Sequence, residues 1–415
     1  MNSTIQKYKF LIFFLLSIIF RIIHFKFSGY GTFFCCDVSR YLDSSENIIN
    51  GNYNLINDLF ITAPAYSYYL AFLRIISGDN FVNLLIITQI IISSIGTVFI
   101  IKIAEKIFNN KTITNISGLT YSIYPPTFFY AHMIAQETLF EFFFIITAYY
   151  YCKFANKNKI KYLAIFSVFA SLTILTKSHV TIIFALLIIS ILIISKEIKK
   201  KLYNSVIVIL IIAFITFPNG YYNYVKNGLY VLSSSGGGMF MSAYHNDKIY
   251  NFLVEIDSLD EIKEKDTIHL YPASNINLNN MVIKEKESYW INEAIDWIKN
   301  NQKKFIKMKL HNFFNFIIPG PNIHHYSFNK WLISFLISGP IYIGAYISIY
   351  KCVKIKFQKH LLIMSVFIGM AIFSTLFMPI DRFIFTTLEP FLIIYFSHFI
   401  QMLSLKLNLF RSIST

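Results

Sequence analysis

The chain has 415 residues, of which 55% are hydrophobic and only 14% are charged. Soluble globular proteins contain about 45–50% apolar and about 25% charged residues, so this composition excludes an ordinary water-soluble enzyme. The formal net charge of +15 comes from lysines in short clusters between apolar stretches, which is typical of membrane proteins. The sequence has no basic patch with interleaved aromatic residues, so it does not predict a nucleic-acid partner.

Apolar stretches of bilayer length predict an all-α polytopic membrane protein with about ten transmembrane helices. The first stretch follows Lys7 and Lys9 and lacks a small-residue cleavage site. We therefore interpret it as an uncleaved span rather than a signal peptide. The predicted spans are 9–27, 82–104, 112–131, 138–153, 160–176, 178–195, 202–222, 330–350, 360–378 and 383–405.

Charge alternates along the connections between these spans. Every second connection is rich in lysine: Lys106 and Lys111, Lys153 to Lys161, Lys196 to Lys201, Lys351 to Lys359, and Lys406 with Arg411. By the positive-inside rule these connections face the cytoplasm, as does the N-terminus. We expect a multi-pass protein of the plasma (inner) membrane whose other connections are extracytoplasmic.

Three regions follow from this topology. Residues 1–222 form an N-terminal transmembrane core whose first outside loop is 28–81, residues 223–329 form a small extracytoplasmic segment, and residues 330–415 form C-terminal spans. The outside loop contains two amphipathic stretches, Asp37–Asn50 and Pro64–Ile76, which predict helices lying in the membrane interface.

The extracytoplasmic segment has a composition of its own. It contains a Ser/Gly run (Ser233 to Gly238), an acidic stretch around Asp257 to Asp266, and a helical pattern from Glu285 to Phe316. The Ser/Gly run is either a flexible loop or a phosphate cradle made of backbone amides.

No definite cofactor site is predicted. The cysteines are Cys35, Cys36, Cys152 and Cys352, whose spacing indicates neither a disulfide framework nor a zinc site. His324 and His325 are adjacent and are interpreted as loop residues. His132 and His179 lie near the outer face and could join Glu137 around a divalent metal, which leaves metal dependence open.

Two acids at the outer face are candidate catalytic residues. Asp37 begins the first outside loop, where a carboxylate could act as general base toward an acceptor. The alternative is an N-cap on the helix that follows. Glu137, next to Gln136 on the turn before span four, is either a second acid that orients the acceptor or a charge on a helix dipole.

Cations on separate outside turns are candidate phosphate ligands. Lys177 breaks the charge rule between spans five and six, and either snorkels to water or binds a phosphate. Arg382 either pairs with Asp381 or binds phosphate through two parallel hydrogen bonds. Arg40 lies one turn from Asp37. Ionisable groups gathered on one side of a membrane are costly, which favours a function.

The chain resembles the GT-C membrane glycosyltransferases, in particular the protein O-mannosyltransferases and lipid A aminoarabinose transferases. The resemblance rests on weak motifs in the order of that family over about residues 10 to 400. They are D-x3-Y and N-G-N-Y (Asp37, Tyr41, Gly51, Tyr53), A-P-A-Y (Ala63 to Tyr66), Y-P-P (Tyr124 to Pro126), Q-E (Gln136, Glu137), L-T-K (Leu175 to Lys177), N-Y (Asn223, Tyr224) before the Ser/Gly run, and R-F with E-P (Arg382, Phe383, Glu389, Pro390).

The resemblance implies a GT-C-like fold and transfer of a sugar from a polyprenyl-phosphate donor at the extracytoplasmic face, with inversion at the sugar carbon. The acceptor is a lipid, a glycan or a protein. Asp37 and Glu137 would be catalytic, and Lys177, Arg382 and Arg40 would bind the donor phosphate. The residues Tyr41, Tyr66 and Gln136 would position the substrate.

Two positions depart from the family pattern. Val38 follows the loop aspartate where many relatives have a second acid, which puts metal assistance from this loop in doubt. Tyr222 replaces the arginine of an R-N pair, which removes one candidate phosphate contact. Two other classes remain open: a transporter or flippase of a lipid-linked sugar, and a non-catalytic partner in a membrane assembly. Charges placed mostly at span ends favour the enzyme.

Overall fold

The computed structural model describes residues 3–28, 37–52, 63–194, 197–234, 236–254, 281–320, 328–377 and 381–413, and it contains no strand in these ranges. The predicted all-α class is confirmed. Cys35, Cys36, Tyr53, the acidic stretch and the histidine pair lie outside the described residues. Cys152 and Cys352 are buried free thiols.

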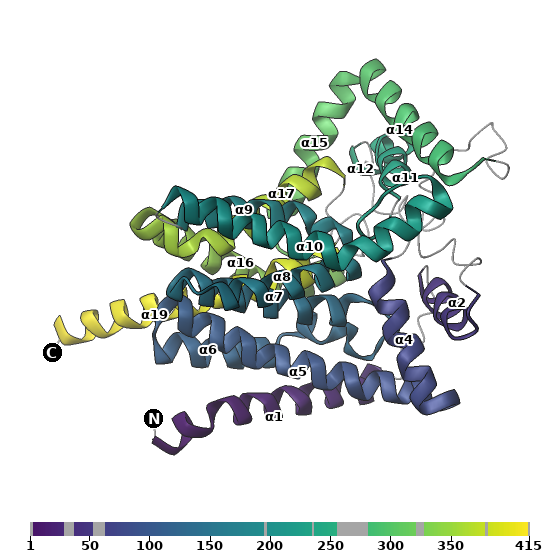
Figure 1. Cartoon of the computed structure of the whole chain (residues 1–415). Helices are drawn as coiled ribbons and strands as arrows, with labels where there is room; N and C mark the ends of the chain where they lie inside the picture. The colour runs from purple at the N-terminus through teal and green to yellow at the C-terminus, as the bar shows by residue number, and fades with distance from the viewer. Residues whose placement is uncertain are drawn as a thin grey trace.

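The described residues of the N-terminal half form a series of helices (Figure 1). The α-helices are α1 (Ser3–Ser28), α2 (Val38–Ile49), α4 (Pro64–Ser77), α5 (Phe81–Phe108), α6 (Lys111–Ile123), α7 (Glu137–Lys157), α8 (Ile160–Thr176), α9 (Thr181–Ile194) and α10 (Ile198–Asn227). Short 3₁₀ turns occur at η2 (Gly78–Asn80), η3 (Pro125–Thr127), η4 (Phe129–His132) and η5 (Ser178–Val180).

The C-terminal half is also helical in its described residues. Its helices are α11 (Gly237–Ala243), α12 (Asp247–Val254), α14 (Ile283–Asn300), α15 (Gln302–Ile317), α16 (Phe328–Lys356), α17 (Leu361–Leu376), α18 (Asp381–Thr387) and α19 (Glu389–Ile413), with the 3₁₀ turn η8 (Phe357–His360) before α17. Both amphipathic stretches of the first loop are helical, as α2 and α4. The helical pattern of 285–316 is divided into α14 and α15 at Asn301.

All ten predicted spans coincide with helical segments, with two corrections. The third span is α-helical only to Ile123, because the next residue precedes Pro125 and the residue before a proline avoids the α conformation. The tenth span is divided at Leu388 into α18 and α19. The total of about ten crossings stays a prediction.

In the described part of the chain, five helical segments are long and apolar enough to cross a membrane. They are Tyr8–Ser28, Pro64–Phe108, Ile198–Asn227, Phe328–Leu376 and Glu389–Leu407, and Ile160–Thr176 and Ser178–Ile194 are shorter apolar helices. The chain is therefore a multi-pass membrane protein.

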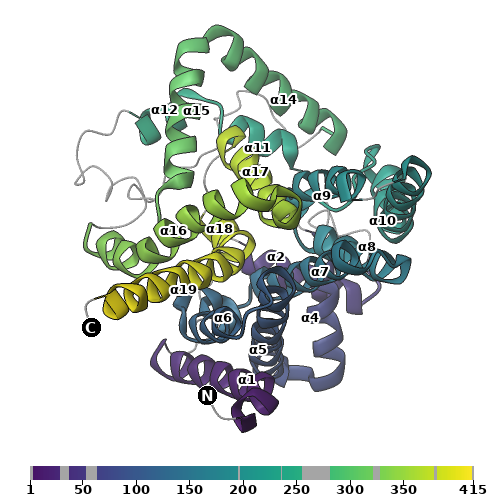
Figure 2. The same cartoon turned by 90° about the vertical axis from the view of Figure 1, so that its left-hand side faces the viewer.

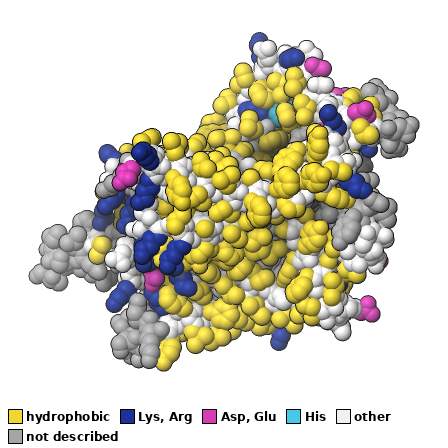
Figure 3. All heavy atoms as spheres, viewed as in Figure 1, with side chains coloured by type: hydrophobic (Ala, Val, Ile, Leu, Met, Phe, Trp, Pro, Cys, Tyr) yellow, Lys and Arg dark blue, Asp and Glu magenta, His cyan; other side chains and the backbone are white. Residues whose placement is uncertain are grey.

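The long helices lie side by side in a bundle, seen along its side in Figure 1 and towards one end in Figure 2. Both chain termini are at one end of the bundle, while α2, α4 and the α11–α14 region are at the other. Figure 3 shows hydrophobic side chains across the middle of the bundle and Lys and Arg side chains gathered at the end with the termini. This arrangement agrees with the alternation of charge along the sequence.

A buried arginine ties the first helix to the bundle. Arg21 of α1 is 1% exposed and donates through Nε to Ser93 Oγ at 2.8 Å and through Nη2 to the Thr127 carbonyl at 3.3 Å. Lys9 also pairs with Glu105 of α5. Because a charge in an apolar surrounding must be satisfied, these contacts fix α1 against α5 and the η3 turn.

The sidedness of the bundle is testable by cysteine labelling. In a variant whose four native cysteines are serine, Asp43→Cys on exposed α2 should react with a membrane-impermeant maleimide in intact cells. Lys157→Cys, at the exposed C-terminal end of α7, should react only after permeabilisation. The reverse pattern would place the termini outside and contradict the predicted orientation.

Candidate active site

Asp37 stands at the start of α2 but does not cap it. Its side chain makes no capping hydrogen bond to the helix. Instead, Oδ2 accepts a hydrogen bond from Arg382 Nη1 at 3.2 Å, and Oδ1 lies 3.6 Å from Arg40 Nη1. The Asp37 side chain is 25% exposed, so its carboxylate is held between two arginines and still reaches open space. The capping interpretation is therefore wrong.

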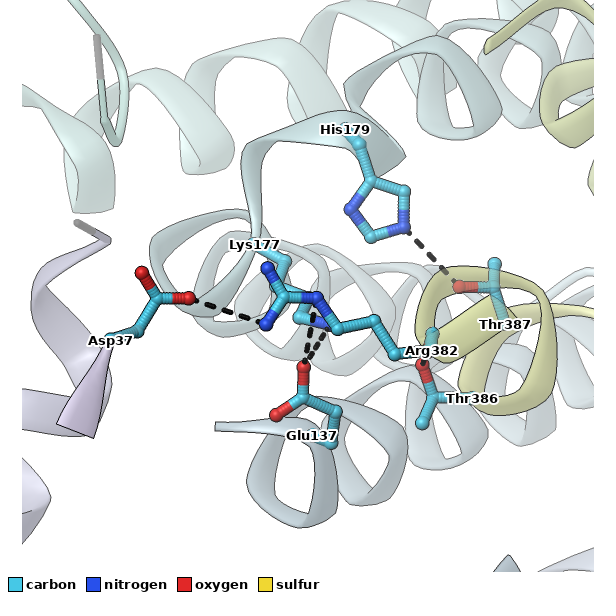
Figure 4. Close-up of polar contacts among 7 residues, drawn as sticks. All are labelled: Asp37, Glu137, Lys177, His179, Arg382, Thr386 and Thr387. Atoms are coloured by element: carbon cyan, nitrogen blue, oxygen red, sulfur yellow. Dashed lines mark hydrogen bonds and ion pairs between the residues drawn. The ribbon is translucent and has the colours of Figure 1, made fainter. Parts of the chain in front are cut away.

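Arg382 lies between two carboxylates from distant parts of the chain (Figure 4). Besides its bond to Asp37, its Nε is 3.9 Å from Glu137 Oε1. Its side chain is 38% exposed, which leaves the guanidinium accessible to a ligand. The side chain of Asp381 is outside the described residues. The arginine thus joins α18 to the start of α2 and to α7.

A buried ion pair lies beneath this arginine. Lys177 Nζ donates to Glu137 Oε1 at 2.8 Å, and both side chains are only 2% exposed. Glu137 is the first residue of α7, and Lys177 occupies the extended link between α8 and η5. Lys177 therefore does not snorkel to water. Glu137 does lie at a helix N-terminus, and it has two cationic partners in addition.

Burial and neighbouring charges compete at Lys177, which lies in the link between two apolar helices. Burial lowers the pKa of its ammonium to about 8, against the attraction of Glu137, and the charge of Arg382 lowers it further. Burial alone would raise the pKa of Glu137, but Lys177 and Arg382 outweigh it and hold this pKa below its usual value. The pair is thus charged at neutral pH.

An aromatic platform supports the cations. Lys177 Nζ lies 4.4 Å from the centre of the Phe383 ring, which stacks on His179 with ring centres 4.5 Å apart. The imidazole of His179 also makes a hydrogen bond to Thr387 Oγ1 at 3.3 Å. Cation–π contacts of this kind help to hold a desolvated ammonium in place. The role of Phe383 beneath the charges did not follow from the sequence.

The three candidate positioning residues lie on neighbouring elements. Tyr41 packs edge-on against Tyr66 with ring centres 5.0 Å apart, and both rings are buried. The hydroxyl of Tyr66 donates to Gln89 Oε1 at 3.3 Å. This hydrogen bond fixes the Tyr66 ring, against which Tyr41 packs. In the described structure the Oε1 atom of Gln136 is buried and has no hydrogen-bond partner, so the side chain keeps an unused acceptor next to Glu137.

The Ser/Gly run lies next to Lys177, but the backbone N–H of Gly238 already has a partner within the chain. Ser234 Oγ is 3.2 Å from Ser178 Oγ, the residue after Lys177. The backbone N–H of Gly238 donates to Glu287 Oε2 at 2.7 Å. A Cβ at position 238 would lie 2.6 Å from the Glu287 carbonyl oxygen, so α14 packs tightly here. A carboxylate of the chain itself therefore fills the proposed phosphate cradle.

The proposed metal ligands are not brought together. His179 contacts Thr387, and His132 lies 3.2 Å from Ser28 Oγ and against His24. Within the described ranges, no three His, Cys, Asp or Glu side chains converge as a set of metal ligands. Asp37 and Glu137 both face cations.

Part of the chain matches a known family. Residues 62–222 match the family model of dolichyl-phosphate-mannose-protein mannosyltransferases. This range contains Tyr66, Gln136, Glu137 and Lys177 but neither Asp37 nor Arg382. No curated protein matches the chain by sequence.

Solved structures match over nearly the whole chain. The oligosaccharyltransferase of Archaeoglobus fulgidus tethered with an acceptor peptide aligns at a TM-score of 0.60 and 14% identity, over 99% of this chain and 51% of that one. The archaeal oligosaccharyltransferase AglB from the same organism, in complex with an inhibitory peptide and a dolichol-phosphate, aligns at 0.59 and 13%, over 99% and 52%. The chain has the GT-C fold.

The GT-C fold and the family match confirm the resemblance carried by the motifs. This GT-C chain spans about half the length of the solved structures that it matches. The five charged side chains of the site alternate in sign from one contact to the next: Arg40, Asp37, Arg382, Glu137 and Lys177.

The buried pair predicts a large effect of Glu137 on stability. Glu137→Ala leaves the ammonium of Lys177 buried without its closest partner, and breaking one side of a buried ion pair costs about 3–5 kcal/mol. Thermal unfolding of the purified protein in detergent should show this loss.

The matched control is the double variant Glu137→Met/Lys177→Met. It removes both charges and keeps apolar volume, so we expect it to regain most of the lost stability while staying inactive. A Glu137→Ala protein as stable as wild type would show that the pair does not hold these helices together.

Proposed function

We propose that the protein is an inverting glycosyltransferase that moves a sugar from a polyprenyl-phosphate donor to an acceptor at the extracytoplasmic face. The observation that carries this proposal is the partly exposed carboxylate of Asp37 at 3.2 Å from the partly exposed guanidinium of Arg382. A base and an anion-binding group thus lie side by side at the rim of a membrane-embedded bundle.

The two groups suit one direct displacement. Asp37 accepts the proton of the acceptor as the acceptor atom attacks the sugar carbon. The bond from that carbon to the phosphate oxygen breaks, and its electron pair leaves with the polyprenyl phosphate. Arg382 stabilises the negative charge that develops on the phosphate, assisted by Arg40. Attack from the side opposite the phosphate inverts the sugar carbon.

Lys177 and Glu137 act from beneath this pair. The ammonium of Lys177 neutralises Glu137, so the guanidinium of Arg382 remains free to attract an anion. Tyr41 and the unpaired amide oxygen of Gln136 would orient the substrate beside Asp37. In this way the fold supplies both positioning and charge stabilisation.

The comparisons support the class of donor. A dolichol-phosphate is present in the structure of the archaeal oligosaccharyltransferase, and the matching family model is named for a dolichyl-phosphate sugar donor. A lipid phosphate is a good leaving group, which fits a site that has one base and several cations. The acceptor would be a lipid, a glycan or a peptide reached from outside the plasma membrane.

Removing the base should abolish transfer. Asp37→Asn keeps the size of the side chain but cannot accept the proton, so we expect sugar transfer to fall by at least a hundredfold, at the low end of the general-base range of roughly 10²–10⁴. Transfer from labelled polyprenyl-phosphate sugars in membranes measures this directly.

Asp43→Asn is the matched control, because Asp43 lies on the same helix with an exposed side chain. It should retain wild-type activity. Full activity of Asp37→Asn, with equal amounts of folded protein in the membrane, would remove Asp37 as the base.

The proposal also predicts an alkaline limit. The pKa of Lys177 is lowered to about 8, so its charge is present below that pH and is lost as the pH rises through it. Uncharged Lys177 leaves Glu137 to compete for Arg382, and kcat/KM for the donor should then fall above about pH 8.

Lys177→Arg tests this assignment, since arginine keeps its charge over the whole range. Its alkaline limit should move to higher pH. An unchanged limit in this variant would assign the loss of activity to another group.

A further inference from the structure

A hollow lies at the end of the bundle that carries the chain termini. It has a volume of about 580 Å³ and is formed where α5, α16, η8 and α19 meet. Its apolar wall includes Ile107, Phe108, Ile355 and Met402. None of the residues assigned to the candidate active site lines it, so it requires an explanation of its own.

The mouth of the hollow is strongly basic. Lys351, Lys354, Lys356 and Lys359 line it, and all four are exposed. No Asp or Glu is among its lining residues, and in the described part of the chain none of these lysines forms an ion pair. Four unneutralised ammonium groups around one cavity create a site for an anion.

Two histidines add hydrogen-bond donors to the wall. His398 Nδ1 lies 2.8 Å from Ser348 Oγ, and His360 Nδ1 lies 2.7 Å from the Tyr395 hydroxyl. When both hydroxyls donate to Nδ1, each neutral ring carries its proton on Nε2. Both histidines line the hollow, so their rings add polar groups to its wall beside the lysines.

The outer surface of α16 distinguishes a lipid from a soluble anion. Ile343, Ile347 and Tyr350 follow each other at positions i, i+4 and i+7, so they lie along one face of the helix. They are 55%, 38% and 69% exposed, and Tyr350 also lines the hollow. An apolar strip therefore leads from the membrane-facing part of α16 to the basic mouth.

We propose that this hollow binds an anionic phospholipid, with its phosphate among the four lysines and its acyl chains along the exposed face of α16. Basic pockets between transmembrane helices suit anionic head groups. The bound lipid would bridge α5, α16 and α19, which are far apart in sequence, and would hold this end of the bundle together. The proposal is independent of the transfer reaction.

Binding is measured with delipidated full-length protein in detergent. Phosphatidylglycerol should bind and raise the unfolding temperature, whereas phosphatidylcholine should bind at least tenfold more weakly. The triple variant Lys351→Gln/Lys354→Gln/Lys356→Gln should lose at least tenfold in affinity for phosphatidylglycerol. Because these side chains are exposed, the variant should fold normally, and the corresponding triple arginine variant should retain binding.

The matched control is Lys199→Gln/Lys200→Gln/Lys201→Gln, which removes the same charge from a cluster that does not line the hollow. It should bind phosphatidylglycerol as wild type does. An equal loss of affinity in this control would show that the lipid responds only to general surface charge, and would overturn the proposal. Glycerol 3-phosphate binding as tightly as the lipid would show a soluble-anion site, and equal affinity for both phospholipids would overturn the proposal.

Discussion

The ion pair between Lys177 and Glu137 is the constraint on which the candidate site depends. Two opposite charges that are 2% exposed can exist at the membrane edge only as partners, because an unpaired buried charge costs several kcal/mol. The pair joins the start of α7 to the end of α8, and Arg382 adds α18 to it. The geometry of the rim is therefore tied to the packing of the bundle.

The fold separates structural support from contact with the substrate. The buried pair supplies structure and fixed charge, while Asp37 and Arg382 are partly exposed and can meet a substrate. Asp37 precedes α2 near the N-terminus and Arg382 lies on α18 near the C-terminus, so the site forms only when both parts of the chain are folded. The opposite end of the bundle carries a second basic region with an apolar approach, whose chemistry suits membrane lipid rather than a reacting phosphate.

The helices could be predicted from the sequence because each apolar stretch, and the lysines that flank it, can be read from consecutive residues. The end of α6 at Ile123 also had a local signal in Pro125. The pairing of Asp37 with Arg382, 345 residues apart, could not be predicted from spacing, since it depends on how α18 packs. The filled cradle was missed for a similar reason: the carboxylate of Glu287 comes from a helix 49 residues beyond Gly238. The stacking of Phe383 on His179 had no sequence signal beyond the R-F motif.

The proposed reaction cleaves a polyprenyl-phosphate sugar beside Asp37 and Arg382. The most direct measurement follows purified protein in nanodiscs with a donor labelled in both the sugar and the lipid, and separates the products by class. We expect one molecule of free polyprenyl phosphate for each molecule of glycosylated acceptor, with the configuration of the sugar carbon inverted. Movement of the intact lipid-linked sugar across vesicle membranes without release of polyprenyl phosphate would contradict the proposed reaction and identify a transporter.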